Sequence, residues 1–249
     1  MRERSYPNLH GNSSDSNTDW QSNSGLFMKN IFTTSNNQGA QHGFTLVEIS
    51  IVLVIIGTIL FALLKSQAVI SSAKAKNVVT IINDLRTATT YFKQRYSYLP
   101  GDLPAPANYI TATPALIAGT GGTPGNGLIE GTVNGAGQAV AGSEVAQAPW
   151  QLFNAGLIGT INASTPTNYL NTNYGPVHIV TNAIANGLVP GFTALNPGAQ
   201  HAIIFFNLPC DVANEVDSKM DDGSLTTGAG LGSAACTGSN TLPVYAIAL

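Results

Sequence analysis

The chain has 249 residues, of which 23 are Lys, Arg, Asp or Glu, so 9% are charged against about 25% in an ordinary soluble domain. This composition excludes highly charged disorder. A net charge of −3 with only ten Lys and Arg residues argues against a nucleic-acid-binding protein, because phosphate binding needs clustered positive charge.

The charge is unevenly placed along the chain. Residues 65–96 contain six basic groups and one acidic group, whereas residues 97–249 contain eight acidic groups and one basic group. This division predicts two parts with different roles. Residues 1–43 are rich in Ser and Asn and have no periodicity, so we predict that they form a leader peptide outside the fold.

The strongest signal is the apolar segment Phe44–Leu64, which has 21 residues and one ionisable group. A helix needs about 20 apolar residues to cross a bilayer. A buried core helix of this length normally carries a polar stripe, and residues 49–64 have none. The segment is therefore predicted to be a transmembrane helix.

Glu48 is the ionisable group in this segment. A carboxylate at membrane depth costs about 2.5–3.5 kcal/mol on insertion scales, so it needs a partner or a proton. On a helix, Glu48 lies one turn beyond Phe44 on the same face. We expect Glu48 to lack a partner before cleavage, and a cut before Phe44 would create one, an α-amino group in the same subunit or in a neighbour.

Residues 43–48, GFTLVE, followed by an unbroken apolar run, resemble the processing site of type IV pilins and type II secretion pseudopilins. The resemblance implies that prepilin peptidase cuts after Gly43 and methylates the new N-terminus at Phe44. It also implies that Glu48 guides assembly by pairing with the N-terminal amine of a neighbouring subunit. The implied partners are copies of the chain or other pilins, and an inner-membrane assembly platform.

The resemblance also implies an orientation and a location. The lysines at positions 65, 74 and 76 follow the apolar segment, and the positive-inside rule alone would keep the C-terminal part in the cytoplasm. The processing site instead requires a cytoplasmic leader. We therefore expect a single-pass protein of the inner membrane with a periplasmic C-terminal domain, which later joins a periplasmic or cell-surface filament.

A second start site is present in the leader. Met28 opens a stretch of 16 residues that ends at Gly43 and has a basic residue in second place, which resembles a more usual prepilin leader. We predict that the true start is Met28; the alternative is a genuine leader of 43 residues.

The helical pattern continues beyond the membrane segment. Apolar residues recur at spacings of three and four, which makes one stripe, at Val78, Ile81, Ile82, Leu85, Ala88 and Phe92. Residues 98–101, YLPG, form a stop signal. A helix over about 45–97 would be on the order of 80 Å long, with 44–64 in the membrane and 65–97 outside it, packed on a C-terminal domain.

Residues 98–249 form the predicted Gly- and Thr-rich globular domain. We predict a long irregular loop over 119–142 and short helices over 143–154, capped by Ser143 and interrupted at Pro149, and over 211–220. Strands are predicted over 177–181, 202–207 and 244–249. The expected fold is α+β, with one long helix packed on a small antiparallel sheet, and it matches the pilin fold.

The chain has two cysteines, Cys210 and Cys236. Their spacing is unlike that of zinc or thioredoxin-like motifs. In an oxidising compartment they would close a loop of about 27 residues, for a stabilisation of about 3.5 kcal/mol; the alternative is two buried thiols. Many type IV pilins have a disulfide near the C-terminus, so the resemblance also implies this bond.

The sequence contains no common catalytic motif. The Gly-rich stretch lacks G-x-G-x-x-G and G-K-[ST], and the chain has no G-x-S-x-G. His178 and His201 are predicted to be half-buried structural residues. We therefore expect a structural filament subunit and not an enzyme. The alternatives are a type II secretion pseudopilin and, from another class, a membrane-anchored periplasmic binding module or enzyme.

One acidic group of residues lies near the C-terminus, at Glu215, Asp217, Asp221 and Asp222. Oxygen ligands at this spacing could hold Ca²⁺, and some pseudopilins bind calcium in this region. The D-x-[DN]-x-[DN]-G loop is absent, so the pattern favours a solvated helix end. We predict no cofactor, with Ca²⁺ at Asp217, Asp221 and Asp222 as the alternative.

Overall fold

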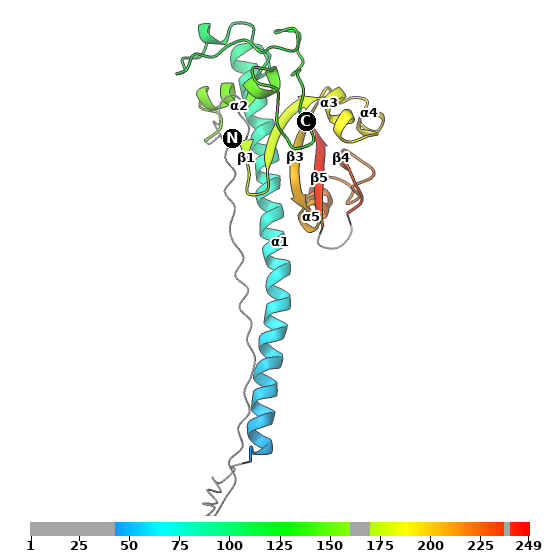
Figure 1. Cartoon of the computed structure of the whole chain (residues 1–249). Helices are drawn as coiled ribbons and strands as arrows, with labels where there is room; N and C mark the ends of the chain where they lie inside the picture. Colours follow the sequence, from blue (N-terminus) through cyan, green and yellow to red (C-terminus); the bar gives the residue numbers. More distant parts are fainter. Residues whose placement is uncertain (1–42, 160–169, 237–239) are drawn as a thin grey trace, which may run out of the picture. The chain divides into compact units, whose positions relative to one another are not determined.

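The computed structural model describes residues 43–159, 170–236 and 240–249 (Figure 1). The predicted leader therefore lies outside the described residues except for Gly43, and so does the alternative start at Met28. The chain divides at Ser50 into two units, a short N-terminal one and a larger one that contains the sheet.

Helix α1 spans Leu46–Tyr96, which confirms the helix predicted over about 45–97. Its C-terminal part buries one face in the core, at Ala75, Val78, Ile82, Leu85, Ala88, Phe92 and Tyr96. The next residue, Ser97, has a left-handed φ of 66°, and its N–H donates to the Lys93 carbonyl at 2.9 Å. This left-handed residue ends the helix.

The sheet has five antiparallel strands in the order β1-β2-β3-β5-β4 (Figure 1). Their bounds are Leu170–Asn171, Pro176–Thr181, His201–Pro209, Gly230–Gly232 and Thr241–Ala248 for β1, β2, β3, β4 and β5. The three predicted strands are the central ones. The edge strands β1 and β4 were missed because two or three residues are too few to show a period. The fold is α+β and pilin-like, as predicted.

The central strand β3 is buried at every position from His201 to Phe206, so both faces of the sheet are covered there. Ile203 pairs with Ile179 of β2 on one side and with Ile247 of β5 on the other. These side chains and the buried face of α1 belong to one hydrophobic core. Helix α1 is therefore held to the domain by apolar burial.

Helix α2, Glu144–Asn154, begins at the predicted cap, where the Ser143 hydroxyl accepts from the Ala146 N–H at 3.3 Å. The predicted interruption at Pro149 is wrong, because the helix continues for five residues beyond it. Most of α2 is buried, and tertiary packing of this kind outweighs one lost backbone hydrogen bond.

The chain leaving α1 packs closely on α2. Gly101 has a φ of 91°, and a Cβ there would lie 2.3 Å from the Glu144 carbonyl oxygen. Its N–H donates to Gln151 Oε1 at 2.7 Å. Only glycine fits this close approach in this backbone conformation.

Four shorter elements complete the described fold. These are a 3₁₀ turn at Pro106–Asn108 and helices α3 at Asn182–Leu188, α4 at Phe192–Leu195 and α5 at Cys210–Met220. Helix α5 was predicted, and α3 and α4 were not. Both lie below the length at which a helical period is recognisable.

The segment 119–142 is an irregular loop, as predicted, with isolated bridges as its only regular pairing among the described residues. Two carboxylates bind its backbone. Asp102 accepts from the N–H groups of residues 125, 126 and 127 at 2.5, 3.1 and 2.9 Å. Glu144 Oε2 accepts from the Glu130 N–H at 2.7 Å.

Two histidines hold the same loop against the sheet. His201 Nε2 accepts from the Ile129 N–H at 3.2 Å, and His178 Nε2 lies 2.9 Å from the Gly137 carbonyl oxygen, to which it donates when protonated there. They are 7% and 0% exposed, so the prediction of half-buried histidines is wrong. The strands that carry them are covered on both faces, which the sequence pattern did not reveal.

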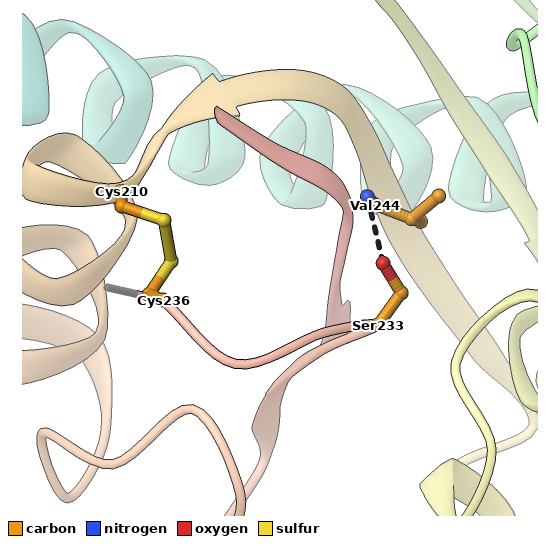
Figure 2. Close-up of a disulfide and its surroundings, with 4 residues drawn as sticks. All are labelled: Cys210, Ser233, Cys236 and Val244. Atoms are coloured by element: carbon orange, nitrogen blue, oxygen red, sulfur yellow. Dashed lines mark hydrogen bonds between the residues drawn. A yellow bond between two sulfur atoms is a disulfide. The ribbon is translucent and has the colours of Figure 1, made fainter. Parts of the chain in front are cut away.

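Cys210 and Cys236 form a disulfide with a Cα–Cα distance of 5.4 Å (Figure 2), as the sequence favoured. Near it, the Val244 N–H donates to Ser233 Oγ at 3.0 Å (Figure 2), and the Ser233 N–H donates to the Val244 carbonyl at 2.9 Å. The bond thus ties the start of α5 to the segment that follows edge strand β4.

Candidate functional site

The predicted processing site lies immediately before α1. Gly43, Phe44 and Thr45 have no regular secondary structure, and Phe44 is 82% exposed. Glu48 Oε2 accepts from the Thr45 N–H at 2.8 Å and from the Thr45 hydroxyl at 2.9 Å. The Glu48 N–H in turn lies 3.2 Å from Thr45 Oγ1. This reciprocal arrangement is a capping box.

The capping box corrects one expectation about Glu48. From the sequence, this carboxylate was expected to lack a partner before cleavage, whereas Thr45 provides one within the same helical turn. The signal was present as the T-x-x-E pattern of residues 45–48, which marks a helix N-terminus. Thr45 is thus a residue of the site that sequence reasoning missed.

The apolar segment is exposed along its whole length in this chain. Its large apolar side chains are 47–91% exposed between positions 44 and 64. Besides Thr45, the segment has two hydroxyls, and both donate to the helix itself: Ser50 Oγ to the Val47 carbonyl and Thr58 Oγ1 to the Ile55 carbonyl, both at 2.8 Å. With these groups satisfied internally, the segment can lie in hydrocarbon. It fits a single-pass membrane anchor.

At the end of α5, Asp217, Asp221 and Asp222 each bring a carboxylate oxygen within 4.8 Å of the other two. We call these three residues the acidic cluster. The fourth predicted member, Glu215, is engaged elsewhere, because it accepts from Lys219 Nζ at 2.8 Å and from Ser72 Oγ at 2.6 Å.

The prediction of a solvated helix end is correct for Asp222 and wrong for Asp217. Asp222 is exposed, whereas Asp217 is 0% exposed. Burial raises the pKa of Asp217, the hydrogen bond from the Tyr245 hydroxyl at 3.0 Å lowers it, and the charges of Asp221 and Asp222 raise it again. The buried position comes from packing of α5 on β5, which the local sequence does not encode.

The other two carboxylates also have backbone partners. Asp221 Oδ2 accepts from the Gly230 N–H at 2.8 Å, and Asp222 accepts from the Ser224 N–H at 2.9 Å and from the Thr227 hydroxyl at 2.6 Å. These hydrogen bonds shape the turn between α5 and β4. The acidic cluster therefore has a structural role whether or not it binds a cation.

Comparison with protein families matches residues 39–64 to the prokaryotic N-terminal methylation motif. The match includes Gly43, Phe44, Thr45 and Glu48. Comparison with curated proteins and comparison with solved structures each gave no match. The chain therefore carries the N-terminal methylation motif that is the signature of type IV pilins and type II secretion pseudopilins.

Proposed function

We propose that the chain is a structural subunit of a type IV filament, cut after Gly43, methylated at Phe44 and assembled through its N-terminal helix. One observation carries this proposal: the methylation motif at 39–64 coincides with an apolar stretch whose side chains have no cover. The prepilin peptidase, other filament subunits and an inner-membrane assembly platform are the partners.

The exposed stretch explains why neighbours are needed. Burying apolar surface is favourable by about 25 cal/mol per Å², so residues 44–64 must be covered by lipid or by other helices. Before assembly, this segment spans the inner membrane. Residues 65–97 continue the helix outside, and the domain over 98–249 lies in the periplasm. After assembly, the same segment packs among copies of itself.

Glu48 exchanges partners in this scheme. In the separate subunit its carboxylate closes the capping box with Thr45. In the filament it pairs with the methylated amine of a neighbour's Phe44. The Glu48 carboxylate and the Phe44 amine are each costly in hydrocarbon without a partner, so their pairing favours the docked subunit.

Mass spectrometry of the mature protein tests the proposal, using cells that have active prepilin peptidase. The expected N-terminus is N-methyl-Phe44 without residues 1–43. Gly43→Glu should block the cut, and this variant and a peptidase-deficient strain serve as controls. A wild-type protein that keeps its leader in peptidase-positive cells would refute the proposal.

A further inference from the structure

A groove of about 640 Å³ runs along the polar face of α1, near the end of β5. Its lining residues on α1 follow spacings of three and four and so share one face. They are Arg86, Thr89, Thr90, Lys93 and Gln94, with Leu99 and Leu249 completing the lining. We call it the basic groove.

The two cations of the basic groove have no carboxylate side-chain partner among the described residues. The Arg86 guanidinium donates to the Ala248 carbonyl at 2.6 Å, and Lys93 is exposed. Within the ranges that the structure describes, the one ion pair joins Lys219 and Glu215. The groove thus carries two cations that form no salt bridge among the described residues, on a domain whose other charges are mostly negative.

The acidic cluster likewise has no partner of opposite charge among the described residues. No lysine or arginine of the described residues lies within ion-pair distance of it. Asp217 Oδ2 is buried and accepts no hydrogen bond there, while Asp222 is exposed and Asp221 half-buried. Three carboxylates this close repel one another, and an incoming cation would relieve that repulsion.

We propose that the basic groove of one subunit binds the acidic cluster of a second copy of the chain. Among the described residues, neither patch has an ion-pair partner of the charge that the other supplies, and such complementarity sets the orientation of a contact. The contact joins two different patches, so it is heterologous and can repeat into an open filament. The inference rests on the proposed filament function and names a contact between the globular domains.

Charge reversal in the full-length chain tests this contact, with the filaments sheared from cells and quantified. Lys93→Glu and Asp222→Lys should each lower filament yield by at least about tenfold, which corresponds to about 1.4 kcal/mol per contact. Producing both single variants in one cell should restore the yield. The reversed groove of a Lys93→Glu subunit then meets the reversed cluster of an Asp222→Lys subunit, and the remaining junctions keep the wild-type pair.

Two kinds of control separate the contact from misfolding. Lys74→Glu and Asp84→Lys reverse exposed charges of α1 outside both patches and should assemble normally. Asp222→Asn keeps an acceptor for the Ser224 N–H and removes only the charge. It should therefore fold and still lower the yield.

The outcomes distinguish this inference from the filament function. Two results would overturn the contact and leave the filament function standing. One is wild-type filament yield from both Lys93→Glu and Asp222→Lys. The other is no recovery in the mixture together with full assembly of Asp222→Asn. A wild-type chain that is neither cut, methylated nor assembled would overturn the filament function and the contact with it.

Discussion

Glu48 accepts hydrogen bonds from both the backbone N–H and the hydroxyl of Thr45, at 2.8 and 2.9 Å. The carboxylate to which the pilin resemblance assigns assembly is therefore also the cap of its own helix. Capping is local and docking involves a neighbour, so the two roles can be separated by mutation.

Glu48→Ala should leave membrane insertion and cleavage after Gly43 intact and should abolish filaments, because it removes the partner of the docking amine. Thr45→Ala removes the N-cap side chain and keeps the carboxylate. A lost N-cap costs about 1 kcal/mol, so this variant should still assemble, with reduced yield. The measurement is the amount of methylated chain in sheared filaments.

The comparison of the two variants decides between the roles. If Thr45→Ala abolished filaments as completely as Glu48→Ala, capping alone would explain the requirement for Glu48. Thr45→Ser keeps the capping hydroxyl and should behave like the wild type.

Glu144 should make the domain less stable as pH rises. Burial raises the pKa of Glu144 from 4.5 to about 7, so its stabilisation is complete below about pH 4.5 and is lost as pH rises through 7. A shift of this size corresponds to about 3 kcal/mol. Glu144→Gln keeps an acceptor for the Glu130 N–H and does not titrate.

The expected result is that Glu144→Gln gains stability relative to the wild type between about pH 5 and pH 8. Urea unfolding of the detergent-solubilised full-length protein measures this difference. Asp84→Asn, at an exposed carboxylate of α1, is the matched control. A pH-independent difference for Glu144→Gln would contradict the assignment.

His201 should instead make the domain less stable as pH falls. Burial lowers its pKa from 6.5 to about 4, with a smaller contribution from the charge of Lys93. Its stabilisation is therefore present above about pH 6.5 and is lost as pH falls through 4, by about 3 kcal/mol in total. Protonation also removes the acceptor for the Ile129 N–H.

His201→Gln should flatten the acid side of the stability profile, although it lowers stability at neutral pH. Unfolding experiments between about pH 4 and pH 7 would show this, and hydrogen exchange at the Ile129 amide would locate the change in the loop. An unchanged slope on the acid side would rule out His201 as its source.

The disulfide should stabilise the domain without affecting processing. Cys210 and Cys236 are separated by 26 positions, for which chain entropy gives about 3.5 kcal/mol. Replacing both by Ser should lower the free energy of unfolding by about this amount, while cleavage after Gly43 remains normal. Reductant should destabilise the wild type and leave the double variant unchanged.

The sequence by itself determined the elements whose signals are local. The apolar run over 44–64 and the stripe from Val78 to Phe92 defined α1 almost to the residue, because helical periodicity repeats over many turns. The three central strands and the cap at Ser143 were equally readable. The GFTLVE motif carried the family signature that the comparison supports.

The tertiary structure decided which polar groups are buried. His178, His201 and Asp217 occur in sequence contexts typical of half-exposed residues, yet all three are buried in the folded domain. Their burial depends on loop 119–142 and on the packing of α5, and both are held by contacts between residues far apart in the chain.

The short elements depended on the tertiary structure for the same reason. Strands β1 and β4 form because they pair with the longer strands β2 and β5. Helix α2 continues past Pro149 because most of it is buried. A long helix can be recognised from a periodicity that repeats over many turns, whereas short elements and buried polar groups take their conformation from the surfaces around them.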